Sequence, residues 1–151
     1  MTSVLFLVNP KLAYDPYPDW ERWIPLVHAG QRVQSTWNVG TRKTGIGPGD
    51  RGFIIKVGQE PRGVVGAAVV TSNIWQGPHW NPEAKRPVTG YVDIDILALC
   101  DLDDPVTLDE LAVIGPSVLW TPRQSGTRID DNVANHLWHI VGADEVSGPS
   151  L

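Results

Sequence analysis

Residues 36–66 constrain the fold more than any other segment, because two apolar runs of strand length alternate there with glycine-rich turns. The runs are residues 52–57 (GFIIKV) and 63–71 (GVVGAAVVT). The short segment between them has the length of a hairpin connection, and a loop rich in glycine precedes Asp50. Small residues in the second run allow another backbone or side chain to approach closely. The segment therefore predicts paired strands in a sheet of short strands.

Further strands are expected on both sides of this segment. Residues 3–8 and 34–39 read as short strands, and residues 91–99 begin with the alternation of a half-buried strand. Residues 73–90 carry prolines and aromatic residues without a clear period, and they are expected to form a long loop. Asp50, after the glycine-rich loop, is expected to stabilise the turn before its strand.

Three helices are expected around the strands. Asp19 is a candidate N-cap for the first, whose apolar residues recur at helical spacing: Trp20, Trp23, Ile24 and Val27. Thr107 and Glu110 have the spacing of a capping box for a short second helix. Residues 129–141 read as a closing helix with an apolar stripe through Val133, Leu137, Ile140 and Val141. Many short strands and few helices predict an α+β fold, a small mixed barrel.

Length and composition fit one domain. The 151 residues can bury a substantial core, and 42% of them are hydrophobic. We expect a single domain over residues 1–145 and a flexible tail over residues 146–151. No apolar run approaches the ~20 residues of a membrane helix, and the N-terminus lacks the features of a signal peptide. Cys100 is the only cysteine, which excludes an internal disulfide and favours a cytoplasmic location.

Charge is distributed unevenly along an acidic chain. The net charge is −5, which weighs against a protein that grips duplex DNA by charge alone. Nine of the twelve Lys and Arg residues nevertheless fall between Arg42 and Arg128, and seven of the seventeen acids crowd into Asp93–Glu110. A basic face and a separate acidic edge are compatible with this pattern, as is an evenly mixed, solvated surface.

Aromatic and small polar residues suggest a pocket for a flat heteroaromatic ligand. Trp37 lies next to Asn38 and Gly40, and the segment Gln124–Gly126 follows Trp120. Indole faces stack on bases, amides offer a donor and an acceptor, and glycines expose backbone groups. No nucleophile or metal cluster accompanies these residues, so a binding function is favoured over catalysis. The candidate base-binding residues are Trp37, Asn38, Gly40, Trp75, Trp80, Trp120, Gln124, Ser125 and Gly126.

The order of these motifs resembles the EVE domain of the PUA-like superfamily, and in particular the EVE-like domains that precede HNH nuclease domains. The resemblance runs from Trp37 through Gly49-Asp50, Gly63–Gly66, Tyr91–Asp93 and Arg123–Gly126 to the closing helix. It implies a curved barrel of five or six mostly antiparallel strands with flanking helices, distantly similar to YTH domains. The implied activity is binding a modified or flipped base, in DNA or RNA, in an aromatic pocket. No HNH motif follows residue 145, so a nuclease would act as a separate partner.

The resemblance also bears on individual residues. It favours a position of Trp37 in the wall of the pocket over a position in the hydrophobic core. It places Trp80 on the opposite wall of the pocket. Ser125 or Thr127 is a candidate N-cap of the closing helix, with its free N–H groups facing the cavity. Phosphate contacts are expected from basic residues around the mouth, namely Arg42, Lys43, Arg51, Arg62, Arg123 and Arg128.

Two other functions stay open. An ASCH-like hydrolase of a small modified nucleoside would use Lys56, Thr71 and Glu60, although their spacing is unpersuasive. A regulatory domain that binds a peptide or a metabolite would suit the acidic charge. The pairs Asp93/Asp95 and His136/His139 each lack a third ligand, so neither a metal nor a cofactor is expected.

Overall fold

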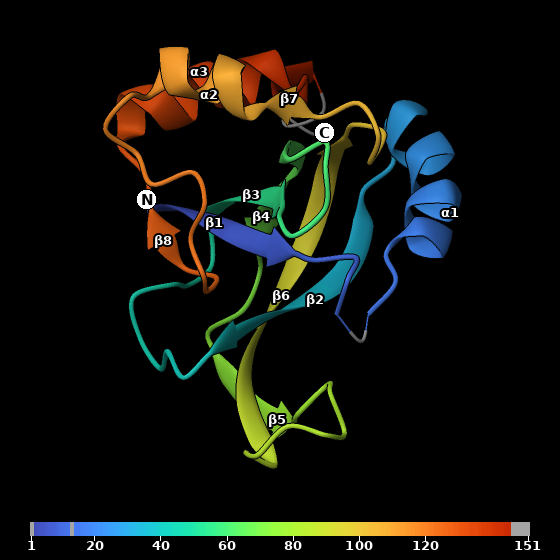
Figure 1. Cartoon of the computed structure of the whole chain (residues 1–151), viewed down its shortest axis with the longest axis vertical. Coiled ribbons are helices and arrows are strands. Elements are labelled where there is room, and N and C mark those ends of the chain that lie inside the picture. The colour runs from blue at the N-terminus through green and yellow to red at the C-terminus, as the bar shows by residue number, and fades with distance from the viewer. Residues whose placement is uncertain (1, 13, 146–151) are drawn as a thin grey trace.

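The computed structural model describes residues 2–12 and 14–145, in which strands and helices are mixed as expected for an α+β fold (Figure 1). The predicted tail, residues 146–151, lies outside the described residues. The elements in chain order are β1 (Ser3–Val8), α1 (Tyr17–His28), β2 (Val33–Gly40), β3 (Arg51–Lys56), β4 (Gly63–Val70), β5 (Trp75–Pro78), β6 (Val88–Leu99), β7 (Val106–Thr107), α2 (Leu108–Ile114), β8 (Thr127–Arg128), α3 (Asp131–Ile140) and a 3₁₀ turn (Ala143–Glu145). None of these helices combines the length and the apolar character needed to cross a membrane.

The strands form one curled, mostly antiparallel sheet in the order β2-β6-β4-β3-β1-β8. Only β1 and β3 run parallel among the described pairs; β5 adds to β6, and β7 adds to β4. Five strands are long, and three have four residues or fewer. Within the described residues β2 and β8 are the two ends of the order, so the sheet curls without closing. The expected barrel is therefore a curved sheet with an open seam between β2 and β1.

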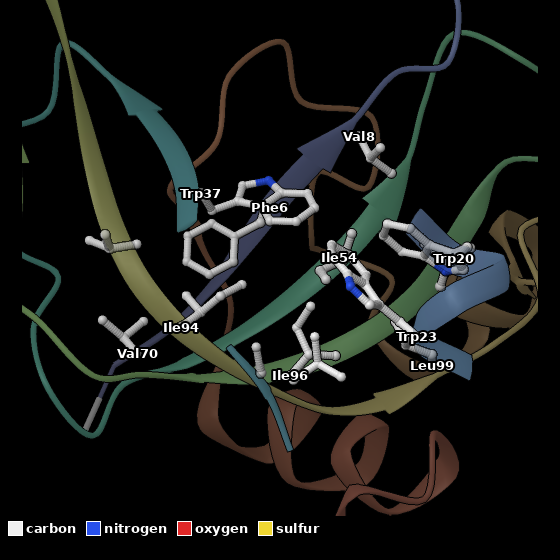
Figure 2. Packing of buried hydrophobic residues seen from close by; sticks show 14 of the residues in the cluster. Phe6, Val8, Trp20, Trp23, Trp37, Ile54, Val70, Ile94, Ile96 and Leu99 are labelled. Carbon is white, nitrogen blue, oxygen red and sulfur yellow. The ribbon is translucent and has the colours of Figure 1, made fainter. Parts of the chain in front are cut away.

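Two hydrophobic clusters hold the sheet from opposite sides. Successive residues of β3 alternate between them, with Ile54 in one cluster and both Phe53 and Ile55 in the other. The first cluster contains Trp20 and Trp23 from α1 together with Trp37, and Figure 2 shows these indoles around Phe6 and Ile54. The second cluster lies under α2 and α3, which cover the other side of the sheet (Figure 1). The predicted hairpin of β3 and β4 is confirmed by their antiparallel register.

Local signals for turns and for the second helix are confirmed. The Oδ2 atom of Asp50 accepts a hydrogen bond from the N–H of Gly47 at 2.8 Å, which closes the predicted turn. Thr107 and Glu110 form the predicted capping box at the start of α2. The predicted loop 73–90 is partly wrong, because β5 pairs there with a β6 that begins at Val88.

Both other helices begin elsewhere than predicted. Pro16 precedes α1 at the N-cap and makes no side-chain cap, whereas Asp19 lies in the first turn. The N-cap of α3 is Asp130, whose carboxylate accepts from the N–H of Asn132 at 2.8 Å. Ser125 and Thr127 were expected there, but Thr127 instead pairs with β1.

The buried face of α3 is also displaced from the predicted stripe. Ala134, Leu137 and Trp138 are buried, while Ile140 is exposed. Val133 and Val141 are partly buried against the second cluster.

Candidate functional site: a pocket in the open seam of the sheet

A pocket of about 860 Å³ occupies the seam where the curled sheet stays open. Its volume lies within the range of small-molecule sites, about 300–1,000 Å³. Segments distant in sequence line it, among them β2, the end of β1 with the following loop, and the segment 121–125 before β8. The predicted site residues that it brings together are Trp37, Asn38, Gly40, Trp80, Gln124, Ser125, Arg62 and Arg123.

Backbone groups of Leu7 explain why the seam stays open. β8 pairs with β1 only at Val4 and Leu5, so the strand ladder ends before Leu7. The N–H of Leu7 instead donates to Oγ of Ser125 at 2.9 Å, and its carbonyl accepts from Nε1 of Trp37 at 3.0 Å. Two side chains thus satisfy the backbone where a neighbouring strand would otherwise do so. Leu7, Trp37 and Ser125 all line the pocket at this point.

The two indoles of the pocket differ in burial. Trp37 is 8% exposed, and its ring lies 6.4 Å from that of Phe6 and 6.5 Å from that of Trp20 (Figure 2). Trp37 is therefore a core residue that also borders the pocket. At the level of sequence a core position and a pocket position were alternatives, and the structure combines them. Trp80 is 40% exposed and lies beside His79 with ring centroids 5.6 Å apart. Of the two indoles, Trp80 has the surface that is free to meet a ligand.

Hydrogen bonds fix the orientation of the Asn38 amide. Its Nδ2 group donates to Oγ1 of Thr89 at 2.9 Å and to the carbonyl of Gly90 at 3.1 Å. The hydroxyl of Thr89 in turn donates a hydrogen bond to the carbonyl of Gly40 at 3.2 Å. A carbonyl only accepts, so the nitrogen of the amide must face Gly90. Asn38 was expected to offer a donor and an acceptor, but only its Oδ1 acceptor is left for a ligand.

The segment before β8 supplies the facing polar groups. Because the hydroxyl of Ser125 accepts from the N–H of Leu7, its own proton is free to be donated. Gln124 and Arg123 are exposed at the same wall. These groups reach the pocket from a loop paired to β1 and not from a helix N-terminus.

Sequence reasoning missed several pocket residues. Tyr14, Asp19 and Trp23 line the pocket from α1 and the segment before it, and Tyr91 lines it from β6. The Tyr14 hydroxyl donates to Asp19, and burial together with this hydrogen bond raises the pKa of Tyr14. Burial also raises the pKa of Tyr91, so both phenols are neutral at physiological pH. The alternation Tyr91-Val92-Asp93 was a signal that Tyr91 lies on the polar face of its strand.

Three predicted base-binding residues lie outside the pocket lining. Trp120 is buried in the second cluster, and its Nε1 donates to the carbonyl of Gly115 at 2.9 Å. Gly126 donates its N–H to the carbonyl of Leu5 at 2.8 Å. Trp75 lies on β5, where it stacks on Tyr91.

The predicted phosphate contacts are also dispersed. Arg62 lines the pocket, but its Nε lies 2.7 Å from Oε1 of Glu60 in an exposed ion pair. Arg51 donates to Asn135 at 2.7 Å and covers the ring of Trp138, away from the seam. Lys43 is exposed and does not line the pocket.

Arg42 and Arg128 converge near the seam. A Cβ placed on Gly45 would lie 3.2 Å from Nη1 of Arg42 and 3.1 Å from Nη2 of Arg128. Arg42 also donates to the carbonyl of Gly126 at 2.9 Å. Within the described residues neither guanidinium pairs with a carboxylate.

The residues considered for catalysis do not meet in the pocket. The buried Lys56 donates to the carbonyl of Leu102, whereas Thr71 and Glu60 are exposed, and none of the three lines the pocket. No group of three or more His, Cys, Asp or Glu residues in the described part of the chain is arranged to hold a metal ion.

Comparison with known proteins gives a fold-level match. No family model and no curated protein matches the sequence. Among solved structures, a hypothetical protein from Leishmania major is similar over 96% of this chain and 97% of its own, with a TM-score of 0.63 and 16% identity. Human THYN1, in complex with DNA containing 5-methylcytosine, covers 94% of this chain and 98% of its own at a TM-score of 0.57 and 14% identity. The Mmi1 YTH domain in complex with RNA is similar over 95% of this chain and 79% of its own, with a TM-score of 0.52 and 13% identity.

These similarities show the fold. The chain has the fold of the THYN1 structure and of the Mmi1 YTH domain, which agrees with the curved sheet and flanking helices that the sequence resemblance implied.

Proposed function

We propose that this chain, which has the fold of EVE and YTH domains, is a non-catalytic module that binds nucleic acid carrying a modified base. The base would be flipped out of its strand and held in the seam pocket. The observation that carries the proposal is the convergence of Trp37, Trp80, Asn38 and Ser125 from three distant segments on one cavity. Solved structures of the same fold, one with DNA containing 5-methylcytosine and one with RNA, support it.

The pocket groups match the chemistry of a flipped base. Flipping costs a few kcal/mol, and stacking on an aromatic side chain returns about 1–3 kcal/mol per base. Trp80 has the exposed ring for this stacking, and the largely buried Trp37 borders the same pocket. Oδ1 of Asn38 suits the exocyclic amino group of cytosine or adenine, because that group donates and Oδ1 only accepts.

Arg42 and Arg128 supply the phosphate contact in this proposal. Two like charges held close together repel each other, so a bound anion between them would lower their energy. Arg42 already donates to the carbonyl of Gly126, and this bond orients its guanidinium next to the segment that lines the pocket. Arg123 at the pocket wall is a further candidate. A phosphate here would set the position of the strand while the pocket reads the base.

A cytoplasmic location accompanies this proposal, since nucleic acid is the expected partner. A separate nuclease that acts on the recognised nucleic acid is a further proposed partner.

Binding of matched oligonucleotides tests the proposal. We expect the protein to bind an oligonucleotide containing 5-methylcytosine or N6-methyladenine more tightly than its unmodified counterpart, as measured by fluorescence anisotropy. Trp80→Ala should reduce the affinity for the modified strand by about 5- to 150-fold, which corresponds to the loss of one stacking contact. Val113→Ala is the matched control, because Val113 is an exposed apolar residue on α2. Equal affinity for modified and plain strands of every tested kind would refute the proposal and favour a peptide or metabolite ligand.

A further inference from the structure

An exposed aromatic pair continues the pocket wall outward along the sheet. Trp75 on β5 stacks on Tyr91 of β6, with ring centroids 4.9 Å apart and an interplanar angle of 29°. Tyr91 lines the pocket, whereas Trp75 does not, and Trp75 is 39% exposed. The pair lies near the end of the molecule formed by β5 and the start of β6, opposite α2 and α3 (Figure 1).

Two hydrogen bonds and the absence of a side chain at Gly77 hold this pair in place. Nε1 of Trp75 donates to Oδ1 of Asp93 at 3.0 Å, and the Tyr91 hydroxyl donates to the carbonyl of Pro78 at 2.6 Å. A Cβ on Gly77 would lie 2.8 Å from Cζ3 of Trp75, so only a glycine leaves room for the indole over the strand. One face of the indole lies against Tyr91, and 39% of the residue remains exposed. An aromatic ring fixed in this way loses little conformational freedom when a ligand stacks on it.

The register of the sheet relates this ring to the pocket. Asn38 of β2 pairs with Tyr91, and Tyr91 pairs with Trp75, so the three side chains form one row on one face of the sheet. Adjacent strands are about 4.8 Å apart, which separates β2 from β5 by about 10 Å. This distance equals about three stacked base steps of 3.4 Å. A nucleic-acid strand whose flipped base occupies the pocket would therefore bring a nearby base to Trp75.

Basic residues lie at the same end of the molecule. Lys85 and Arg86 are exposed in the loop between β5 and β6, against one exposed acid, Glu83. In the described residues neither Lys85 nor Arg86 forms an ion pair. Positive charge at the same end of the molecule as an exposed aromatic ring is a combination that single-stranded nucleic acid binds.

We propose that Trp75, stacked on Tyr91, is a second base-binding surface for an unpaired base a few nucleotides from the one in the pocket. This proposal rests on the proposed function and adds that the preferred ligand is a single strand, or a locally opened one, that is longer than one nucleotide. The second surface reads no base identity, because every base has a face that can stack.

Comparing ligands of two lengths tests the proposal. We expect Trp75→Ala to lower affinity for a single-stranded nonamer with a central 5-methylcytosine by about 5- to 150-fold. The same substitution should leave affinity for free 5-methyl-2′-deoxycytidine unchanged. Trp80→Ala, at the pocket, should weaken both. Unchanged nonamer affinity in Trp75→Ala, while Trp80→Ala still weakens binding, overturns the second surface and leaves the proposed function standing.

Abasic sites separate stacking from a structural role of the indole. If Trp75 stacks on a neighbouring base, replacing the bases that flank the methylcytosine by abasic sites should remove the effect of Trp75→Ala. An equal loss with and without flanking bases would show that the substitution only perturbs β5, and would refute the proposal. Trp75→Phe should retain much of the affinity, whereas Trp75→Leu should not. This pair keeps the test decisive if the alanine variant fails to fold, and thermal unfolding of each variant checks the fold.

Discussion

Replacing Trp37 by alanine is expected to damage the fold before it reports on binding. Trp37 is 8% exposed and packs with Phe6 and Trp20 in the first cluster. Truncating a buried Trp to Ala costs about 3–5 kcal/mol in free energy of unfolding. The carbonyl of Leu7 also loses its indole partner, and an unsatisfied buried acceptor costs about 1–3 kcal/mol. Water entering the seam would reduce this second cost.

With the second cost reduced by water to about 1 kcal/mol, the two contributions predict a loss of about 4–6 kcal/mol for Trp37→Ala. Small domains have about 5–15 kcal/mol in total, so the variant would lie near its limit of stability. Trp80→Ala is the matched control, because its exposed side chain should cost less than about 1 kcal/mol. Trp37→Phe keeps an aromatic ring but loses the hydrogen bond, and should lie between the two.

Urea unfolding followed by far-ultraviolet circular dichroism measures these differences. We expect a lower midpoint for Trp37→Ala with an unchanged dependence of the free energy on urea concentration. A loss smaller than about 1.5 kcal/mol, with a cooperative transition, would show that Trp37 does not hold the seam and would refute this reasoning. With the expected loss, impaired binding by Trp37→Ala would carry no information on the pocket, and Trp80→Ala would be the informative variant.

Three further outcomes are expected. Burial raises the pKa of the Cys100 thiol to about 11, so Ellman's reagent should react far more slowly with the folded protein than with the urea-unfolded protein; equal rates would contradict this. Burial lowers the pKa of Lys56 in the folded protein below its usual 10.5. Between the folded and the unfolded pKa the unfolded chain therefore binds more protons than the folded protein. The free energy of unfolding should then rise with pH through that interval. Lys56→Met should remove this rise. If the free energy of unfolding depends on pH in the same way in both proteins between neutral pH and about pH 10, the rise does not come from Lys56. Arg128→Ala should reduce the slope of log affinity against log salt for single strands by about 0.7, whereas Arg51→Ala should leave it unchanged; equal slopes in all three proteins would exclude the phosphate contact.

The parts of the fold that could be predicted from sequence depend on short-range geometry. The capping box of Thr107 and Glu110 and the turn closed by Asp50 each join groups three residues apart, and both formed as expected. The N-cap role expected of Ser125 failed because its hydroxyl binds Leu7, 118 residues away in sequence. A local pattern holds no information about a partner at that distance. β5 was missed for a related reason: four residues that include Gly77 and Pro78 show no period, and pairing with β6 defines the strand.

In the candidate site, too, the sequence indicated the types of residue, but not which of them would lie together. Residue types suited to a base drew attention to Trp37, Asn38, Trp80, Gln124 and Ser125, and the structure brings these side chains to one pocket. Their base-binding roles stay predictions. Trp120 has the same chemistry but lies in the other cluster, because only the register and the curl of the sheet decide which face a residue joins.

The open seam connects the architecture with the proposed function. A closed barrel would pair the outer edges of β2 and β1 with each other and leave no cavity between them. Here the indole of Trp37 and the hydroxyl of Ser125 take the place of that pairing at Leu7. Side chains occupy less of the seam than a strand would, and the pocket lies in the remaining space. The contacts that stabilise the open sheet are therefore also those that shape the pocket, so sequence changes that close the seam would remove the site and leave the rest of the fold in place.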